Sequence, residues 1–332
     1  MYLVAEIGVN HNGCPETAEL LIREAAGSGA SAVKFQHFEA QKLALAHTPK
    51  VAYQKVTSRE DESHQEMLAK LQITGDIERR AISVCSELGL EFISTPYDPE
   101  SAKHLVDIGC DYIKTASADV VDHRIHKVIA EANVQAVIAL GMATFEEIDD
   151  MLQIYDNCSR RPILLHCVSN YPCSYDSLNL RVITELQKRY ECEIGFSDHS
   201  VDENAAIIAY VLGCRFFEKH FTLDKNAEGP DHQASSTPLE FRHLYEALLR
   251  TEKILGQPQK VVQPEEENMR LVSRKSIHAI ENIYKGEMFT EKNITMIRPG
   301  GGLSGSFYDA VLTRKATKNI LKGDQISLED IK

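Results

Sequence analysis

The first 255 residues alternate short, β-rich apolar runs with longer amphipathic patterns, and this alternation restricts the fold more than any other feature. The candidate strands span residues 2–8, 32–36, 91–94, 112–115, 134–139, 162–166, 193–197 and 215–220. The candidate helices that follow them span residues 15–26, 76–88, 99–108, 123–132, 145–156, 179–189, 201–212 and 238–255. Eight such units predict a (β/α)₈ barrel of the TIM type. A doubly wound open sheet is the alternative, but no Gly-x-Gly-x-x-Gly motif follows the first strand.

One connection in this pattern is too long for a simple loop. Residues 38–74 separate the second strand from its helix, and connections of that length usually carry structure of their own. The sequence at 53–55 and at 66–68 predicts an extra helical insertion over the catalytic face of the barrel.

The alternating pattern of apolar and amphipathic segments ends after residue 255. We expect a barrel domain at 1–256, a polar linker at 257–270 and a small β-rich domain at 271–332. That last part contains a repeat, because residues 279–294 and 316–331 share an Asn-Ile-x-Lys-Gly-acidic pattern. The repeat predicts a pseudo-symmetric module with a turn at each Lys-Gly, too small to be stable without the barrel or a partner subunit. Between the copies, a flexible glycine run exposes Arg298; an ordinary hairpin loop is the alternative interpretation.

Composition narrows the class of protein. With 332 residues, 43% apolar and 26% charged, the chain is an ordinary globular protein with no apolar run long enough for a membrane span. We therefore expect a cytoplasmic protein. A net charge of −13 argues against nucleic acid or an anionic membrane as a partner. The eight cysteines are scattered, which indicates neither a zinc knuckle nor a disulfide framework.

Two histidines end neighbouring predicted strands. His199 follows the seventh strand and His220 ends the eighth, with one helix between them. Parallel neighbours lie about 4.8 Å apart, so each imidazole can offer a nitrogen to one divalent cation. Chemistry in parallel α/β folds gathers at the carboxyl ends of strands, which favours this metal site over two hydrogen-bonded core histidines.

Cations and hydroxyls end other predicted strands. Two lysines at barrel strand ends need charged partners, and structural salt bridges barely repay their desolvation. A site for phosphate or carboxylate is the better interpretation. Lys34 and Gln36 are two residues apart, so both point to the same face of the second predicted strand. The other residues of this predicted site are Thr95, Lys114, Ser117 and Ser197.

These residues belong to motifs that resemble the bacterial sialic acid synthases, a group that includes the legionaminic and pseudaminic acid synthases. The motifs are AEIGVNHNG at 5–13, VKFQ at 33–36, ISTP at 93–96, GFSDH at 195–199, EKHFT at 218–222 and GPDH at 229–232. The C-terminal part, with IRPG at 297–300, resembles the antifreeze-like (SAF) domain that ends these enzymes. The likeness covers almost the whole chain.

The resemblance implies condensation of phosphoenolpyruvate with the open-chain aldehyde of an N-acylated hexosamine, giving a nine-carbon 2-keto acid and phosphate. It implies a divalent metal, manganese with magnesium or cobalt as alternatives, on His199 and His220, and Glu6 as a candidate base. It also implies a domain-swapped homodimer. The implied phosphoenolpyruvate ligands are Lys34, Thr95, Lys114, Ser117, Ser169 and Ser197. The implied sugar ligands are Gln36, Tyr171, Glu218, Asp231 and Arg298, the last supplied across the dimer interface.

Several positions depart from the family pattern. Ala139 and Leu140 stand where the family usually has Ser-Thr, which predicts the loss of one phosphate donor, and Asp119 replaces a glutamate. Phe35 and the sequence after Pro230 favour the sialic and legionaminic branch over the pseudaminic one. Three alternatives remain: a pseudaminic acid synthase, another phosphoenolpyruvate-dependent synthase of keto-deoxy sugar acids, and a non-catalytic carbohydrate-binding protein.

Overall fold

The computed structural model describes residues 1–45, 47–50 and 63–332. The chain divides into two compact units, Met1–Gly256 and Gln257–Lys332.

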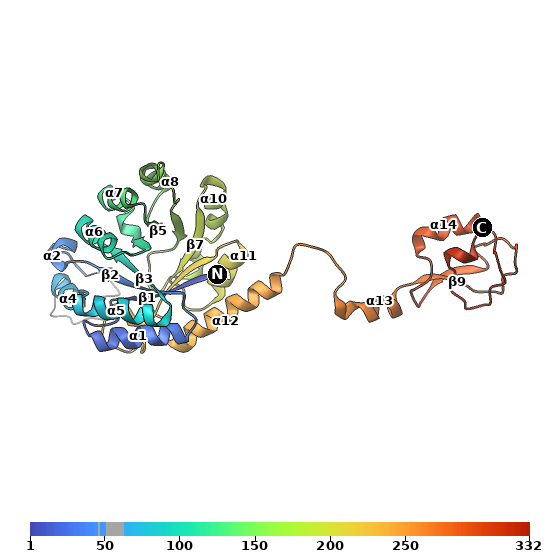
Figure 1. Cartoon of the computed structure of the whole chain (residues 1–332), viewed down its shortest axis with the longest axis horizontal. Helices are drawn as coiled ribbons and strands as arrows, with labels where there is room; N and C mark the ends of the chain where they lie inside the picture. The colour runs from blue at the N-terminus through green and yellow to red at the C-terminus, as the bar shows by residue number, and fades with distance from the viewer. Residues whose placement is uncertain (46, 51–62) are drawn as a thin grey trace. The chain divides into compact units, whose positions relative to one another are not determined.

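The first unit is a closed barrel of eight parallel strands in sequence order, surrounded by helices (Figure 1). This confirms the predicted (β/α)₈ architecture. The strands are β1 (Tyr2–Gly8), β2 (Ala32–His37), β3 (Glu91–Pro96), β4 (Tyr112–Thr115), β5 (Gln135–Ala139), β6 (Ile163–His166), β7 (Glu193–Asp198) and β8 (Phe216–His220).

Helices follow the strands at the predicted places, with shifts at their ends. They are α1 (Pro15–Gly27), α5 (Gly75–Leu88), α6 (Pro99–Asp107), α7 (His123–Ala132), α8 (Phe145–Leu152), α10 (Arg181–Arg189), α11 (Asn204–Val211) and α12 (Pro238–Leu255). The sixth helix begins two residues later than predicted because Asn179 adopts a left-handed φ of 45° and ends a short helix, α9 (Tyr175–Leu178). Helix α12 starts where the sequence indicates, at Pro238 after a capping box between Thr237 and Glu240.

The barrel interior separates into an apolar floor and a polar mouth. Side chains alternate between the two faces of each strand, so every second residue points inward. The floor is an apolar layer contributed by Val4, Ala32, Ile93, Val137, Ile163, Leu165 and Phe216. Toward the carboxyl ends the inward positions become polar, and the register pairs Glu6 with Lys34 and Gln36 with Thr95. The floor thus closes one end of the barrel, and polar groups gather at the other.

The long connection after β2 contains α2 (Ala40–Leu43) and α4 (His64–Leu71). These helices share a small apolar cluster with Val9 and Phe38. The predicted helical insertion is therefore present in part, although residues 53–55, on which the prediction also drew, lie outside the described residues.

The second unit is built on the predicted repeat. Strands β9 (Ser276–Ala279) and β10 (Ile294–Ile297) pair antiparallel. The two copies also exchange equivalent bonds: the Lys285 amide donates to the Asn319 side chain and the Lys322 amide to the Asn282 side chain, both at 2.9 Å. This unit also contains α13 (Glu267–Ser273), which begins inside the predicted linker, and α14 (Tyr308–Leu312). The reciprocal bonds give the module the pseudo-two-fold symmetry that its sequence predicts.

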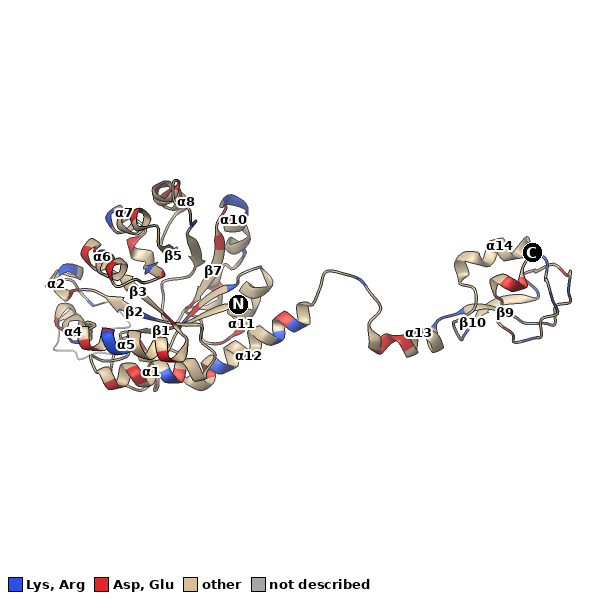
Figure 2. Cartoon of the chain, viewed as in Figure 1, with Lys and Arg blue, Asp and Glu red and all other residues tan. Residues whose placement is uncertain are grey.

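Residues of both charge signs occur on the outer helices of the barrel (Figure 2). Attraction of an anion to the mouth therefore depends on local lysines, since the net charge of the chain is −13. No helix in the described ranges is both long and apolar enough to cross a membrane.

Candidate active site

A cavity of about 320 Å³ opens at the carboxyl ends of the barrel strands. Twelve of the fourteen predicted site residues line it: Glu6, Lys34, Gln36, Thr95, Lys114, Ser117, Tyr171, Ser197, His199, Glu218, His220 and Asp231. Ser169 lies beside the cavity, with its hydroxyl 2.7 Å from that of Ser117. Arg298 is exposed in the second compact unit. The structure thus brings together residues separated by more than 200 positions in sequence.

Two buried lysines line this cavity. Lys34 Nζ is 2.7 Å from Glu6 Oε2 and donates to Thr95 Oγ1 at 3.0 Å. Lys114 Nζ donates to the Thr115 carbonyl oxygen at 3.1 Å and lies 3.7 Å from Glu218 Oε1. Each ammonium group therefore lies next to a carboxylate of the barrel. An anionic ligand would find both cations already desolvated and positioned.

The two carboxylates of this network have opposite pKa shifts. Burial raises the pKa of Glu6 above its ordinary value, although Lys34 opposes that shift. Burial also acts on Glu218, but the positive charges of Lys114 and Lys34 outweigh it and hold its pKa well below the ordinary range. Paired carboxyl groups with separated pKa values are typical of acid and base roles. Glu6 is the member suited to accept a proton.

His199 and His220 meet at the same mouth, with ring centroids 5.7 Å apart. His199 Nδ1 lies 2.7 Å from the Val168 carbonyl oxygen. Because a carbonyl can only accept, Nδ1 carries the hydrogen and the lone pair of Nε2 is left for a ligand. His220 Nδ1 is buried and makes no hydrogen bond within the described part of the chain.

Both imidazoles are in the protonation state that binds metal. Burial lowers the pKa of His199 to about 4 and that of His220 well below its ordinary value. The rings are therefore neutral at pH 7. Two neutral imidazoles, one with a fixed tautomer and one with an unpartnered buried nitrogen, fit a divalent cation.

Ser117, which lines the cavity, adjoins a second hydroxyl and a glycine that lie beside it, Ser169 and Gly141. Ser117 and Ser169 are hydrogen-bonded to each other, and a Cβ built on Gly141 would lie 2.3 Å from Ser169 Oγ. Any side chain at position 141 would therefore fill the space above the two hydroxyls. These three residues offer small donors and no bulk, as a phosphate or carboxylate oxygen requires.

These features agree with the comparisons to known proteins. Residues 21–260 match the NeuB family, and residues 274–332 match the SAF domain. The first match alone covers more than half of the sequence. The chain belongs to the NeuB family.

Relatives of this NeuB-family chain include proteins named as legionaminic and pseudaminic acid synthases. It is 36% identical to an N,N'-diacetyllegionaminic acid synthase of Campylobacter jejuni, covering 98% of both chains. It is 32% identical to the enzyme of the same name from Legionella pneumophila, covering 99% of this chain and 94% of that one. Among solved structures, the sialic acid synthetase of Leptospira borgpetersenii superposes with a TM-score of 0.71 at 28% identity, covering 81% of this chain and 89% of the other. Pseudaminic acid synthases also occur among the relatives.

The departures from the family pattern have unequal structural effects. Ala139 lines the cavity, so its missing hydroxyl alters the site directly. Leu140 instead packs in the core between strands and helices, and its amide donates to the Leu165 carbonyl oxygen. Only the first of the two positions therefore faces a ligand. The Asp119 carboxyl is largely buried, and burial raises its pKa to about 6.

Sequence reasoning did not single out one wall of the cavity. It is contributed by the insertion after β2, through Leu43, Ala44, Thr48, His64, Met67, Leu68 and Leu71. The signal for it was the unusual length of residues 38–74, which predicted a cover over the mouth without identifying the side chains that point into it.

The Gly300–Gly302 segment also differs from its prediction as a flexible run. Gly300 is tied by its amide to the Leu271 carbonyl oxygen at 2.8 Å, and its own carbonyl accepts from Gln325 at 2.9 Å. A Cβ on Gly302 would lie 3.1 Å from Ser276 Oγ. These glycines permit close packing of the segment, and Arg298 remains exposed beside it.

Proposed function

We propose that this NeuB-family chain is a nonulosonic acid synthase. It would condense phosphoenolpyruvate with the open-chain aldehyde of an N-acylated hexosamine, giving a nine-carbon 2-keto acid and inorganic phosphate. The observation that carries the proposal is the convergence of Lys34, Lys114, His199 and His220 on one cavity at the barrel mouth. Two buried cations suit the phosphate and carboxylate of phosphoenolpyruvate.

We assign the following roles to residues of the chain. Lys34 and Lys114 hold the two anionic groups of phosphoenolpyruvate, while the hydroxyls of Thr95, Ser117, Ser169 and Ser197 donate to their oxygens. We propose Mn²⁺ as the resident cation on His199 and His220, where it supplies Lewis-acid polarisation of the aldehyde oxygen.

Carbon–carbon bond formation joins C3 of the enol to the aldehyde carbon, and the resulting alkoxide takes up a proton. Water then adds at C2 and gives a proton to Glu6, whose raised pKa makes it a better base than an exposed carboxylate. The bond between C2 and the phosphate oxygen breaks, the electron pair leaves with phosphate, the proton of the C2 hydroxyl passes to the departing phosphate, and the 2-keto group remains. Gln36 donates to Glu6 Oε1 at 3.0 Å and so orients the base.

For the sugar we propose the 2,4-diacetamido-6-deoxy analogue of N-acetylmannosamine. Gln36, Tyr171, Glu218 and Asp231 lie on the cavity wall and supply polar contacts. The part of the lining contributed by the insertion after β2 is largely apolar, through Leu43, Met67, Leu68 and Leu71. A methyl group at C6 and a second acetyl group bury more apolar surface there than the hydroxyls of N-acetylmannosamine would. The two legionaminic acid synthases among the relatives support the same choice.

The second unit would contribute Arg298 to the sugar-binding site. We propose a domain-swapped homodimer in which the exposed Arg298 of one subunit contacts the sugar bound in the barrel of the other. A module of this size is marginal alone, and attachment to a second barrel would stabilise it.

Other functions are less consistent with the cavity. Of the described residues that line it, Lys34 and Lys114 are the only lysine or arginine residues. These two lysines suit phosphoenolpyruvate and leave no further cationic side chain in this described lining for the phosphate of a phosphorylated sugar. A synthase of keto-deoxy sugar acid phosphates is therefore disfavoured. A non-catalytic carbohydrate-binding protein would gain little from two desolvated lysines. A pseudaminic acid synthase, acting on an altrose-configured sugar, remains the closest alternative.

Phosphate release tests the proposal. The purified protein, with Mn²⁺ and phosphoenolpyruvate, is offered N-acetylmannosamine, its 2,4-diacetamido-6-deoxy analogue and the altropyranose analogue, and products are identified by mass. We expect the highest kcat/KM with the second sugar. A preference for the altropyranose analogue would favour the pseudaminic alternative, and no release with any of the three would overturn the proposed reaction.

A further inference from the structure

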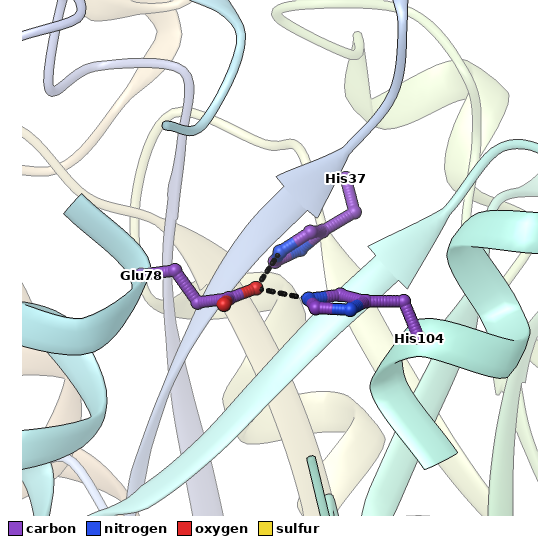
Figure 3. Close-up of side chains that lie close together, drawn as sticks. All are labelled: His37, Glu78 and His104. Atoms are coloured by element: carbon purple, nitrogen blue, oxygen red, sulfur yellow. Dashed lines mark hydrogen bonds and ion pairs between the residues drawn. The ribbon is translucent and has the colours of Figure 1, made fainter. Parts of the chain in front are cut away.

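A second cluster of potential metal ligands lies outside the catalytic cavity. His37 ends β2, Glu78 lies in the first turn of α5, and His104 lies in the last turn of α6 (Figure 3). Glu78 Oε2 is 2.7 Å from His37 Nε2 and 2.6 Å from His104 Nε2. Within the described ranges, this is the one group of three such side chains whose ligand atoms all lie within 4.8 Å of one another.

This cluster is separated from the catalytic mouth by the β-sheet itself. Gln36 lines the cavity, so its neighbour His37 points to the opposite face of β2, toward the surrounding helices. There its ring meets Phe92 edge-on, with centroids 6.5 Å apart. A ligand bound at His37 would therefore not compete with the substrates for space.

The three side chains of the cluster differ in their exposure to solvent. The side chains of His37 and Glu78 are only 8% and 12% exposed, whereas that of His104 is 47% exposed. Two ligands are thus held by packing, and the third lies at the surface. The exposed side gives an ion a route inward and leaves room for water to complete its coordination.

The hydrogen bond between His37 Nδ1 and Ser94 is compatible with the site both with and without a bound ion. His37 Nδ1 lies 2.6 Å from Ser94 Oγ, and Ser94 is fully buried. A carboxylate only accepts, so without an ion Nε2 carries the hydrogen and Nδ1 accepts from the hydroxyl. A hydroxyl can also accept, so Ser94 equally supports the tautomer with hydrogen on Nδ1 and a lone pair on Nε2. That second tautomer is the one that binds metal.

We propose that His37, Glu78 and His104 form a second divalent-metal site, selective for Zn²⁺ over Mg²⁺ or Ca²⁺. Two imidazoles and one carboxylate are ligands that zinc prefers, whereas the other two ions prefer oxygen alone. In a tetrahedral zinc site with metal–ligand bonds of about 2.0–2.2 Å, the ligand atoms lie roughly 3.4 Å apart. The distances from Glu78 Oε2 to His37 Nε2 and to His104 Nε2 would each have to increase by less than about 1 Å to admit the ion. His104, on the surface, can supply that movement. The ion would join β2, α5 and α6, and the site is independent of the proposed synthase reaction.

The test uses the full chain carrying His199→Ala and His220→Ala, stripped with a chelator. These two changes remove the proposed catalytic site, so any remaining zinc reports on other ligands. We expect this background to bind one Zn²⁺ per chain on equilibrium dialysis, to prefer it over Mg²⁺, and to melt at a higher temperature when zinc is present. If the background binds no zinc at micromolar concentration, the cluster is only a hydrogen-bonded clamp and the proposal is wrong.

Two further variants locate that ion. His104→Ala, at a half-exposed position, should lower zinc affinity by about tenfold or more and abolish the zinc-dependent rise in Tm. Glu78→Gln, which keeps the size of the side chain, should do the same. His123→Ala is the matched control, since His123 is similarly exposed and near a single carboxylate, Asp150. Equal zinc binding in His104→Ala and the background would overturn the assignment.

Discussion

Replacing Lys114 with methionine tests whether the buried lysines bind substrate or only hold the barrel together. The substitution shortens the unbranched side chain by one atom and removes its charge. With methionine at position 114, Glu218 would lose Lys114 at 3.7 Å but would keep Ser197, which donates to it at 2.9 Å, and Lys34 at 3.9 Å. We therefore expect the variant to fold.

The size of the kinetic effect follows from what Lys114 would contact. A unit charge 4 Å from another is worth about 4 kcal/mol at an effective dielectric constant near 20. Part of that gain is offset, because Lys114 must give up its interaction with Glu218 when substrate binds. Hydrogen bonds to charged groups typically contribute about 1.5–3 kcal/mol. A loss of about 2–3 kcal/mol corresponds to a roughly 30- to 150-fold fall in kcat/KM for phosphoenolpyruvate.

The assay is phosphate release at saturating sugar and metal with varied phosphoenolpyruvate. Lys219→Met is the matched control, because Lys219 is equally buried but pairs with Asp198 at 2.8 Å, away from the cavity. It should lower Tm and weaken metal binding through the neighbouring His199 segment, while the KM for phosphoenolpyruvate at saturating metal stays near the wild-type value. If Lys114→Met leaves kcat/KM for phosphoenolpyruvate within about twofold of wild type, the lysine is structural and the assigned anion site is wrong.

Three further predictions concern the metal, the dimer and a buried carboxyl. His220→Ala should lose bound manganese, by elemental analysis, and should lose turnover; a variant that still releases phosphate after treatment with a chelator would contradict the assignment. A mixture of Arg298→Ala and His220→Ala should recover roughly a quarter of wild-type activity after subunit exchange, because half the dimers are mixed and each has one intact site; no recovery would exclude action in trans. Asp119→Asn should raise Tm at pH 8 but not at pH 4. Burial raises the pKa of Asp119 to about 6, so the folded state loses stability as pH rises through that value, and asparagine avoids the loss; an equal Tm change at both pH values would refute this.

Much of the barrel and of its mouth follows from local pattern. Short apolar runs separated by amphipathic segments can bury both faces of a parallel sheet only if helices cover it, which leads to the closed barrel. Residues at strand ends such as Lys34, Thr95 and His220 could be predicted to converge because parallel strands all end at one side. The reciprocal repeat of the second unit was likewise visible, since Asn282 and Asn319 occupy equivalent positions in its two copies.

Tertiary structure decided which groups are paired and which face a ligand. Sequence patterns could not indicate that Lys34 is held by Glu6, that Ala139 faces the cavity while Leu140 packs outside it, or that Met67 and Leu71 form its apolar wall. The cluster of His37, Glu78 and His104 shows the limit most clearly, because its members come from one strand and two different helices with no shared motif. Periodicity assigns a side chain to a face of its own element. Contacts between elements depend on how those faces pack, and packing is a property of the whole barrel.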